Sequence, residues 1–200
     1  MDEILPAEQF AGKIGKTYLD SKPHWAEAKK AKSDQPNIVL LVLDDVGFSH
    51  LGCYGSDINT PRIDALAAKG IRFTNFHTTA MCSPTRAALL TGRQHHAAGM
   101  GTIVEWCTGY PGYQGQVTKR AATLADMLRP HGYNTHALGK WHLMRMTDAT
   151  AAGPFDYWPL SRGFDRYYGF LSSLTDHWNP ELFCDNHPIS KPIKSGYHLT

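Results

Sequence analysis

The sequence has 200 residues, of which 42% are hydrophobic and 19% are charged, and its formal net charge is +2. A chain of this length and composition can bury one sizeable core. The small net charge gives no reason to expect nucleic acid or a membrane surface as a partner, and no run of about 18 apolar residues predicts a transmembrane helix.

The cysteines are widely spaced and form no C-x-x-C pair, which favours reduced thiols over a disulfide framework and argues against a structural zinc site. They are Cys53, Cys82, Cys107 and Cys184. Asp2 and Glu3 stand where a signal peptide would carry positive charge, and no apolar stretch follows them. We therefore expect a cytoplasmic protein, with export left open.

Residues 1–35 predict a polar N-terminal extension, to which no chemistry is assigned. The apolar run Ile38–Leu43 then predicts a strand that is buried on both faces, as in a parallel sheet. Asp44 and Asp45 follow this run directly, where ligands collect at the carboxyl ends of strands. Two adjacent carboxylates indicate a Ca²⁺ or Mg²⁺ site or, about equally, a solvated turn with a helix cap.

The next segments alternate between helix and strand, which is the signature of a doubly wound α/β layer. Thr60 and Pro61 predict the start of a helix that Gly70 ends, and residues 71–76 alternate in the manner of a strand. We therefore expect an α/β fold with a mostly parallel sheet and helices on both faces.

A second helix is predicted to begin with Ser83 as its cap and Pro84 in its first turn, and to end at Gly92. Cys82 would lie just outside the helix N-terminus, where free backbone N–H groups favour negative charge. Arg86 follows one turn later. A nucleophile-sized side chain, a helix terminus and an arginine together indicate an oxyanion ester as the substrate.

The third unit of this pattern is a short helix that ends at Gly132, followed by a predicted strand over residues 133–138. Lys140 and His142 come directly after that strand. A lysine near an anion site acts as a point-charge clamp, and a histidine can transfer protons near neutral pH. Taken alone, His142 would more often be an ordinary surface or core histidine.

In combination, these motifs resemble the sulfatase family, specifically the bacterial arylsulfatase type within the alkaline-phosphatase-like superfamily. The resemblance rests on Asp44-Asp45 after a strand, on Cys-x-Pro-x-Arg from Cys82 to Arg86 with Leu-Thr-Gly at 90–92, and on Gly-Lys-Trp-His-Leu at 139–143. It covers roughly residues 36–170 and implies that residues 36–200 are the N-terminal part of a sulfatase catalytic domain.

The resemblance implies that a separate maturation enzyme oxidises Cys82 to Cα-formylglycine, whose hydrated gem-diol is the nucleophile towards a sulfate ester. Asp44, Asp45 and residue 82 would bind Ca²⁺, with Mg²⁺ the less favoured ion. Arg86 would hold and activate the gem-diol. Lys140 would bind the sulfate oxygens, and His142 would orient or deprotonate a hydroxyl of the diol.

Full-length members of this type supply further site residues from beyond the matched region, including an Asp-Asn pair that completes the metal site. Asp185-Asn186 resembles this pair but follows no convincing buried strand, so we interpret it as a turn. The sheet is therefore expected to be incomplete in this chain. The tyrosine- and tryptophan-rich loops hint at an aromatic or otherwise apolar leaving group; their aromatic residues are Trp106, Tyr110, Tyr113 and Trp158.

Three other functions stay open. A phosphodiester or phosphonate monoester hydrolase of the same superfamily would act on a similar tetrahedral oxyanion. A cysteine phosphatase is disfavoured because its phosphate loop needs a longer run of backbone N–H groups, and Pro84 has none. An inactive fragment or binding module is the third alternative.

Overall fold

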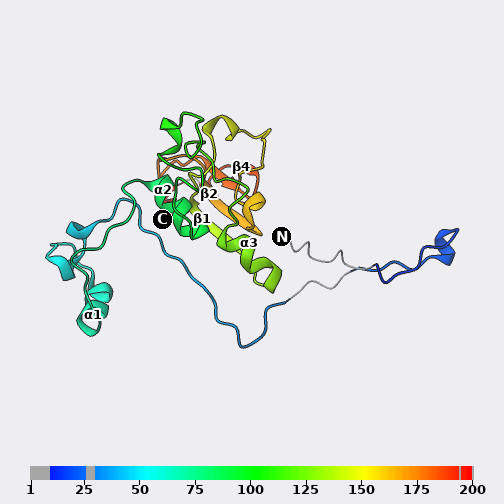
Figure 1. Ribbon diagram of the computed structural model, residues 1–200, viewed down its shortest axis with the longest axis horizontal. Helices are drawn as coiled ribbons and strands as arrows, with labels where there is room; N and C mark the ends of the chain where they lie inside the picture. The colour runs from blue at the N-terminus through cyan, green and yellow to red at the C-terminus, as the bar shows by residue number, and fades with distance from the viewer. Residues whose placement is uncertain (1–9, 26–29, 194, 200) are drawn as a thin grey trace.

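The computed structural model describes residues 10–25, 30–193 and 195–199, and the remainder of the predicted extension lies outside these ranges. Its α-helices are α1 (Pro61–Lys69), α2 (Cys82–Thr91) and α3 (Leu124–Leu128), and its strands are β1 (His136–Lys140), β2 (Arg166–Phe170), β3 (Leu182–Cys184) and β4 (His187–Ile189). Short 3-10 helices lie between them: η1 (Tyr18–Asp20), η2 (Phe48–His50), η3 (Gly52–Tyr54), η4 (Val104–Trp106), η5 (Arg129–His131), η6 (Met146–Asp148) and η7 (Leu160–Arg162). The main body holds α2, α3 and the strands, whereas α1 lies apart from it (Figure 1).

The strands form one mixed sheet in the order β1-β2-β3-β4. β1 and β2 pair in parallel, from His136 opposite Arg166 to Lys140 opposite Phe170. The β2–β3 and β3–β4 pairings are antiparallel. A tight turn at Asp185 joins β3 to β4, and a turn this short can join only antiparallel strands. The predicted α/β class is therefore present, with a sheet that is parallel on the β1 side.

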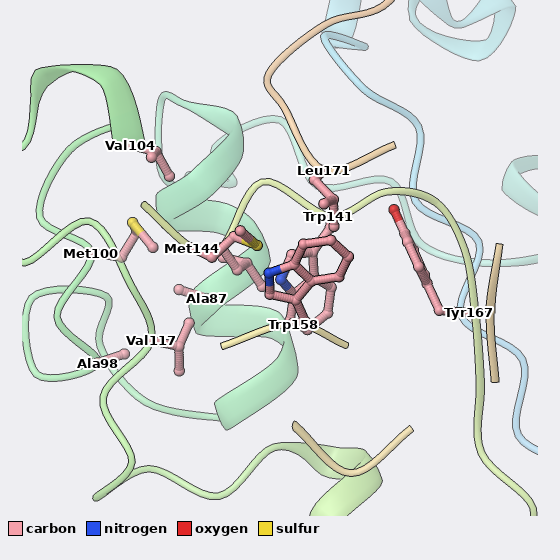
Figure 2. Close-up of a cluster of buried hydrophobic side chains, with 11 residues drawn as sticks. Ala87, Ala98, Met100, Val104, Val117, Trp141, Met144, Trp158, Tyr167 and Leu171 are labelled. Carbon is pink, nitrogen blue, oxygen red and sulfur yellow. The ribbon is translucent and has the colours of Figure 1, made fainter. Parts of the chain in front are cut away.

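The core lies against β1, β2 and α2 and is centred on two tryptophans (Figure 2). Trp158 is fully buried and donates from Nε1 to the carbonyl of Asp148 at 3.0 Å, so its polar atom is satisfied. Trp141 donates likewise to the carbonyl of Tyr157 at 3.0 Å. Trp158 therefore does not contact a leaving group as the loop composition suggested, because its ring packs inside the core against Phe155 and Phe183.

The predicted strand Ile38–Leu43 is not formed in the structure. These six side chains are between 40% and 85% exposed, and the backbone joins no ladder in the described residues. The segment runs beside β1, since the Tyr133 hydroxyl donates to the carbonyl of Pro36 at 3.3 Å and Lys140 meets Asp44. A cavity of about 490 Å³ is lined by both segments, and no strand pairing among the described residues joins their backbones. The predicted burial fails because the ladder to β1 is not closed.

The predicted strand over residues 71–76 is also absent. Phe73 and Phe76 are 60% and 65% exposed, and the segment contacts η3 through Arg72 and through the Tyr54 hydroxyl. An alternating sequence becomes a strand only beside a partner strand, and none lies next to this segment within the described residues.

The predicted helices are present. α2 begins at Cys82, so the prediction that Ser83 is its cap and that Cys82 lies outside it is wrong: Met81 is the last residue with extended backbone and is the N-cap. Gly92, whose φ of 62° suits glycine, ends the helix as predicted.

α3 ends at Leu128, and η5 continues the chain to Gly132. At α3, Thr123 forms a capping box with Asp126. The strand predicted over residues 133–138 is present as β1. It lies slightly later in the sequence than predicted, so that Lys140 is the last residue of the strand and does not follow it. No helix in the described part of the chain has the length and apolar character needed to cross a membrane.

Candidate active site

Helix α2 presents Cys82 and Arg86 from the same face, because residues four apart in an α-helix are neighbours. Its entry is fixed by Thr85, whose hydroxyl donates to the carbonyl of Met81 at 2.7 Å. Ser83 and Pro84 are buried under the first turn. The first turn of α2 is thus anchored to the core, while Cys82 faces the neighbouring segments.

Arg86 joins three segments at the end of β1. Its guanidinium donates to the carbonyl of Lys140 at 2.7 Å and to Asp44 Oδ1 at 3.3 Å. Lys140 Nζ donates to the other oxygen of Asp44 at 2.8 Å. Burial raises the pKa of Asp44, but the hydrogen bond from Lys140 and the charges of Lys140 and Arg86 outweigh it, so the net shift is downward. Asp44 is therefore held as a carboxylate between two cations.

His142 lies directly after β1, with its side chain fully buried. Its backbone N–H donates to the carbonyl of Leu171 at 3.0 Å, which extends the β1–β2 pairing past the strand ends. Its φ of 56° is left-handed, a conformation that costs energy for a non-glycine residue and often marks a functional position. This geometry places Nδ1 at 3.2 Å from Cys82 Sγ.

Glu105 in η4 meets the opposite side of the same ring. Its Oε2 and Oε1 lie 2.9 and 3.1 Å from His142 Nε2. Burial lowers the pKa of His142, Glu105 raises it, and the charges of Lys140 and Arg86 lower it, so the net shift is downward. Burial raises the pKa of Glu105, but its hydrogen bonds, that with His142 first, lower it overall. No sequence motif singles out Glu105, because its partner lies 37 residues away.

A pocket of about 300 Å³ opens beside Cys82 and is lined by Asp44, Asp45, Thr79 and Arg86, among others. The structure therefore brings both predicted carboxylates and Cys82 to one pocket. Within the described ranges, no three side chains of the His, Cys, Asp and Glu types are gathered closely enough to hold a metal ion. In chemical type the carboxylates suit a hard divalent cation, but Ca²⁺ takes about six to eight oxygen ligands. These residues fit as part of a coordination shell.

Asp185 and Asn186 lie away from this pocket, in the turn between β3 and β4. Asp185 accepts from the backbone N–H of Tyr167 at 2.9 Å and from Arg166 Nε at 3.0 Å. These contacts tie the hairpin to β2, in keeping with the interpretation of Asp185 as a turn residue.

Comparisons with known proteins show a family likeness. A family model described as Sulfatase matches residues 36–199. An uncharacterized sulfatase of Schizosaccharomyces pombe, PB10D8.02c, is 40% identical over 192 residues, which span 84% of this chain and 33% of the relative. The arylsulfatase of Klebsiella aerogenes is 35% identical over 78% of this chain and 32% of its own length. Human arylsulfatase A is 42% identical over 80% of this chain and 30% of its own length.

Solved structures show the same likeness. The crystal structure of Ps i-CgsB has a TM-score of 0.64 at 29% identity, over 83% of this chain and 39% of that protein. The structure of the sulfatase-like protein yidJ from Bacteroides fragilis has a TM-score of 0.61 at 26% identity, over 81% of this chain and 37% of that protein. The chain spans about a third of the length of the curated relatives it matches.

Proposed function

Because this chain belongs to the sulfatase family, with part of an alkaline-phosphatase-like fold, we propose that the protein containing it hydrolyses sulfate esters at the Cys82 pocket. The observation that carries the proposal is the meeting of Cys82 with His142 at 3.2 Å, beside the cations of Arg86 and Lys140. A nucleophile position, a proton-transfer group and two cations are the parts that ester hydrolysis of an oxyanion needs.

The two cations would bind and orient the sulfate. Lys140 is 8% exposed and Arg86 14% exposed at their side chains, so water screens them weakly and their attraction for an anion is correspondingly strong. Asp44 holds both in place without substrate. A sulfate entering the pocket would compete with Asp44 for these donors, and charge building on its oxygens would strengthen those hydrogen bonds.

Residue 82 would provide the nucleophile, with Cys82 as the precursor that a maturation enzyme oxidises to Cα-formylglycine. In its hydrated form that group would supply a hydroxyl in place of the thiol. His142 Nδ1 lies 3.2 Å from the side chain of Cys82 and would accept the proton of the hydroxyl at position 82. Arg86, on the same face of α2, would hold the second oxygen of the modified side chain.

The pocket carboxylates Asp44 and Asp45, with the oxygen of residue 82, would hold a divalent cation, for which Ca²⁺ is the proposed ion. When bound, such an ion supplies Lewis-acid stabilisation of sulfate oxygens. Its remaining ligands would come from outside the described residues.

The function is tested with an aryl sulfate and an aryl phosphate diester that share the leaving group 4-nitrophenol. We expect the sulfate to have the higher kcat/KM. Equal or better turnover of the diester would replace the proposal by a phosphodiesterase of the same superfamily.

The nucleophile is tested at Cys82. Replacing Cys82 by alanine should lower hydrolysis by about 10³-fold or more, because the covalent route is lost. A peptide mass spectrum of wild-type protein from a host with the maturation enzyme should show formylglycine at position 82. Matched controls with ordinary activity are Cys53→Ala, Cys107→Ala and Cys184→Ala. Full activity in Cys82→Ala would refute the assignment.

A further inference from the structure

We infer that Glu105 is a positioning residue for His142: its carboxylate fixes the proton on Nε2 and so turns the lone pair of Nδ1 towards residue 82. The inference deepens the proposed function and rests on it, because it assigns His142 to the residue-82 nucleophile. Neither the motifs around Cys82 nor those around Lys140 contain Glu105.

The geometry determines which ring nitrogen carries the hydrogen. A neutral imidazole has one donor and one acceptor nitrogen, and a carboxylate can only accept. Both oxygens of Glu105 lie within 3.1 Å of Nε2, so Nε2 is the donor. Nδ1 is then the acceptor, and it lies 3.2 Å from the side chain of Cys82. Carboxylate, imidazole and nucleophile form a chain in which each group directs the next, the logic of an acid–histidine–nucleophile triad.

Glu105 is itself held in place. It lies in η4, which is anchored by the buried side chain of Val104 at 6% exposure and by the hydrogen bond from Trp106 N–H to the carbonyl of Ile103 at 3.1 Å. With its backbone anchored in this way, Glu105 holds both carboxylate oxygens within 3.1 Å of His142 Nε2.

Glu105 is the group that covers Nε2. The His142 side chain is fully buried with Glu105 in place, whereas the Glu105 side chain is 33% exposed. Truncation of Glu105 would therefore open Nε2 to water, which can donate a hydrogen bond as well as accept one, unlike a carboxylate. The Nε2–H tautomer would then no longer be fixed, and Nδ1 would no longer be held as an acceptor towards residue 82.

The first test reads the tautomer directly and needs no activity. Ring ¹⁵N shifts of His142 are recorded in the protein labelled with ¹⁵N-histidine, and the signals are assigned by their loss in His142→Asn. We expect Nε2–H in the wild type and in Glu105→Gln, whose amide oxygen still accepts, and loss of this signature in Glu105→Ala. An Nδ1–H tautomer in the wild type, or an unchanged signature in Glu105→Ala, would overturn the inference.

The second test separates positioning from substrate binding. Loss of a carboxylate partner of a functional histidine typically costs about 10- to 100-fold in activity. We expect Glu105→Ala to lower kcat by about that factor with KM nearly unchanged, and Glu105→Gln to lower it less. Glu181→Gln, an exposed carboxylate elsewhere, is the matched control. A higher KM at unchanged kcat, or equal losses in the two Glu105 variants, would contradict the inference.

The two tests fail independently. Peptide masses confirm equal formylglycine content, so a lower kcat does not reflect poorer maturation. An Nε2–H tautomer that depends on Glu105, in a protein that does not hydrolyse aryl sulfates, would support the positioning and refute the proposed function. Sulfate hydrolysis that is insensitive to Glu105→Ala would refute the positioning alone.

Discussion

Replacing Arg86 by alanine should destabilise the fold as well as the site, and the size of the loss follows from its contacts. The hydrogen bond from the guanidinium to the Lys140 carbonyl has a charged donor and is worth about 1.5–3 kcal/mol. The ion pair with Asp44 adds about 0–1 kcal/mol, because the Asp44 side chain is 38% exposed and water screens the pair. The largely buried stem adds about 1 kcal/mol from its methylenes.

One feature of Arg86 offsets part of the stabilisation that its contacts provide. Its Nε is buried without a hydrogen-bond partner, so truncation also removes an unsatisfied donor. The stabilising contributions total about 2.5–5 kcal/mol and the unsatisfied Nε offsets about 1–3 kcal/mol, so the expected net loss is about 1–3 kcal/mol in the free energy of unfolding. Arg86→Lys keeps the charge and most of the stem but loses the fork that reaches two acceptors, so about half of that loss should remain.

Urea unfolding measures this directly. With an m value of about 2 kcal/mol/M, the midpoint of Arg86→Ala should fall by about 0.5–1.5 M at an unchanged m value. The control is Lys119→Ala, whose ion pair with Asp156 is short at 2.6 Å but more than half exposed on both sides. Its loss should be about 0–1 kcal/mol. If Arg86→Ala were no more destabilising than Lys119→Ala, the argument that burial outweighs distance here would be refuted.

Two further predictions concern other parts of the fold. The backbone N–H of Tyr167 lowers the pKa of Asp185 below 3.8; burial opposes this shift and Arg166 adds to it. The stabilisation from the Asp185 carboxylate is therefore present above about pH 3.8 and is lost as the pH falls through the lowered pKa. The free energy of unfolding of Asp185→Asn should accordingly depend less steeply on pH below about pH 4 than that of the wild type. An equal slope in the two proteins would contradict this. Leu143→Ala, at a core position with 1% exposure, should cost about 2–5 kcal/mol in thermal or urea unfolding, while Leu174→Ala, at 78% exposure, should stay within about 0.5 kcal/mol; equal effects would argue against the core described above.

The helices were predictable because their signals are local. Their ends are set by residues that act through their own backbone conformation, whatever structure surrounds them. These are Pro61 at the start of α1, Gly92 after α2 and Gly132 beyond α3. The short strands β3 and β4 were not predictable. Each has three residues, which is too few for a periodic pattern. β3 exists because it pairs with β2, and β4 exists because the turn at Asp185 folds it back onto β3.

The candidate site divides in the same way. Cys82 and Arg86 could be placed together from their spacing on one helix, and Lys140 with His142 from their position after a strand. Glu105 could not be found, because nothing in its own segment distinguishes it from an ordinary surface glutamate. Ile38–Leu43 shows the converse, since its apolar pattern is strand-like, but a strand also needs a paired neighbour.

The contacts that build the pocket join residues that are far apart in the sequence, and this affects the order in which the protein folds. The contacts of Lys140 with Arg86 and Asp44 close loops of 54 and 96 residues, and that of His142 with Cys82 closes one of 60. Closing the longest loop costs only about 0.5 kcal/mol more than closing the shortest. Such loops instead slow folding, because their entropy is lost before any contact is gained. Helix α2 can form early from its own residues, whereas the pocket forms only once the chain through His142 has folded against it.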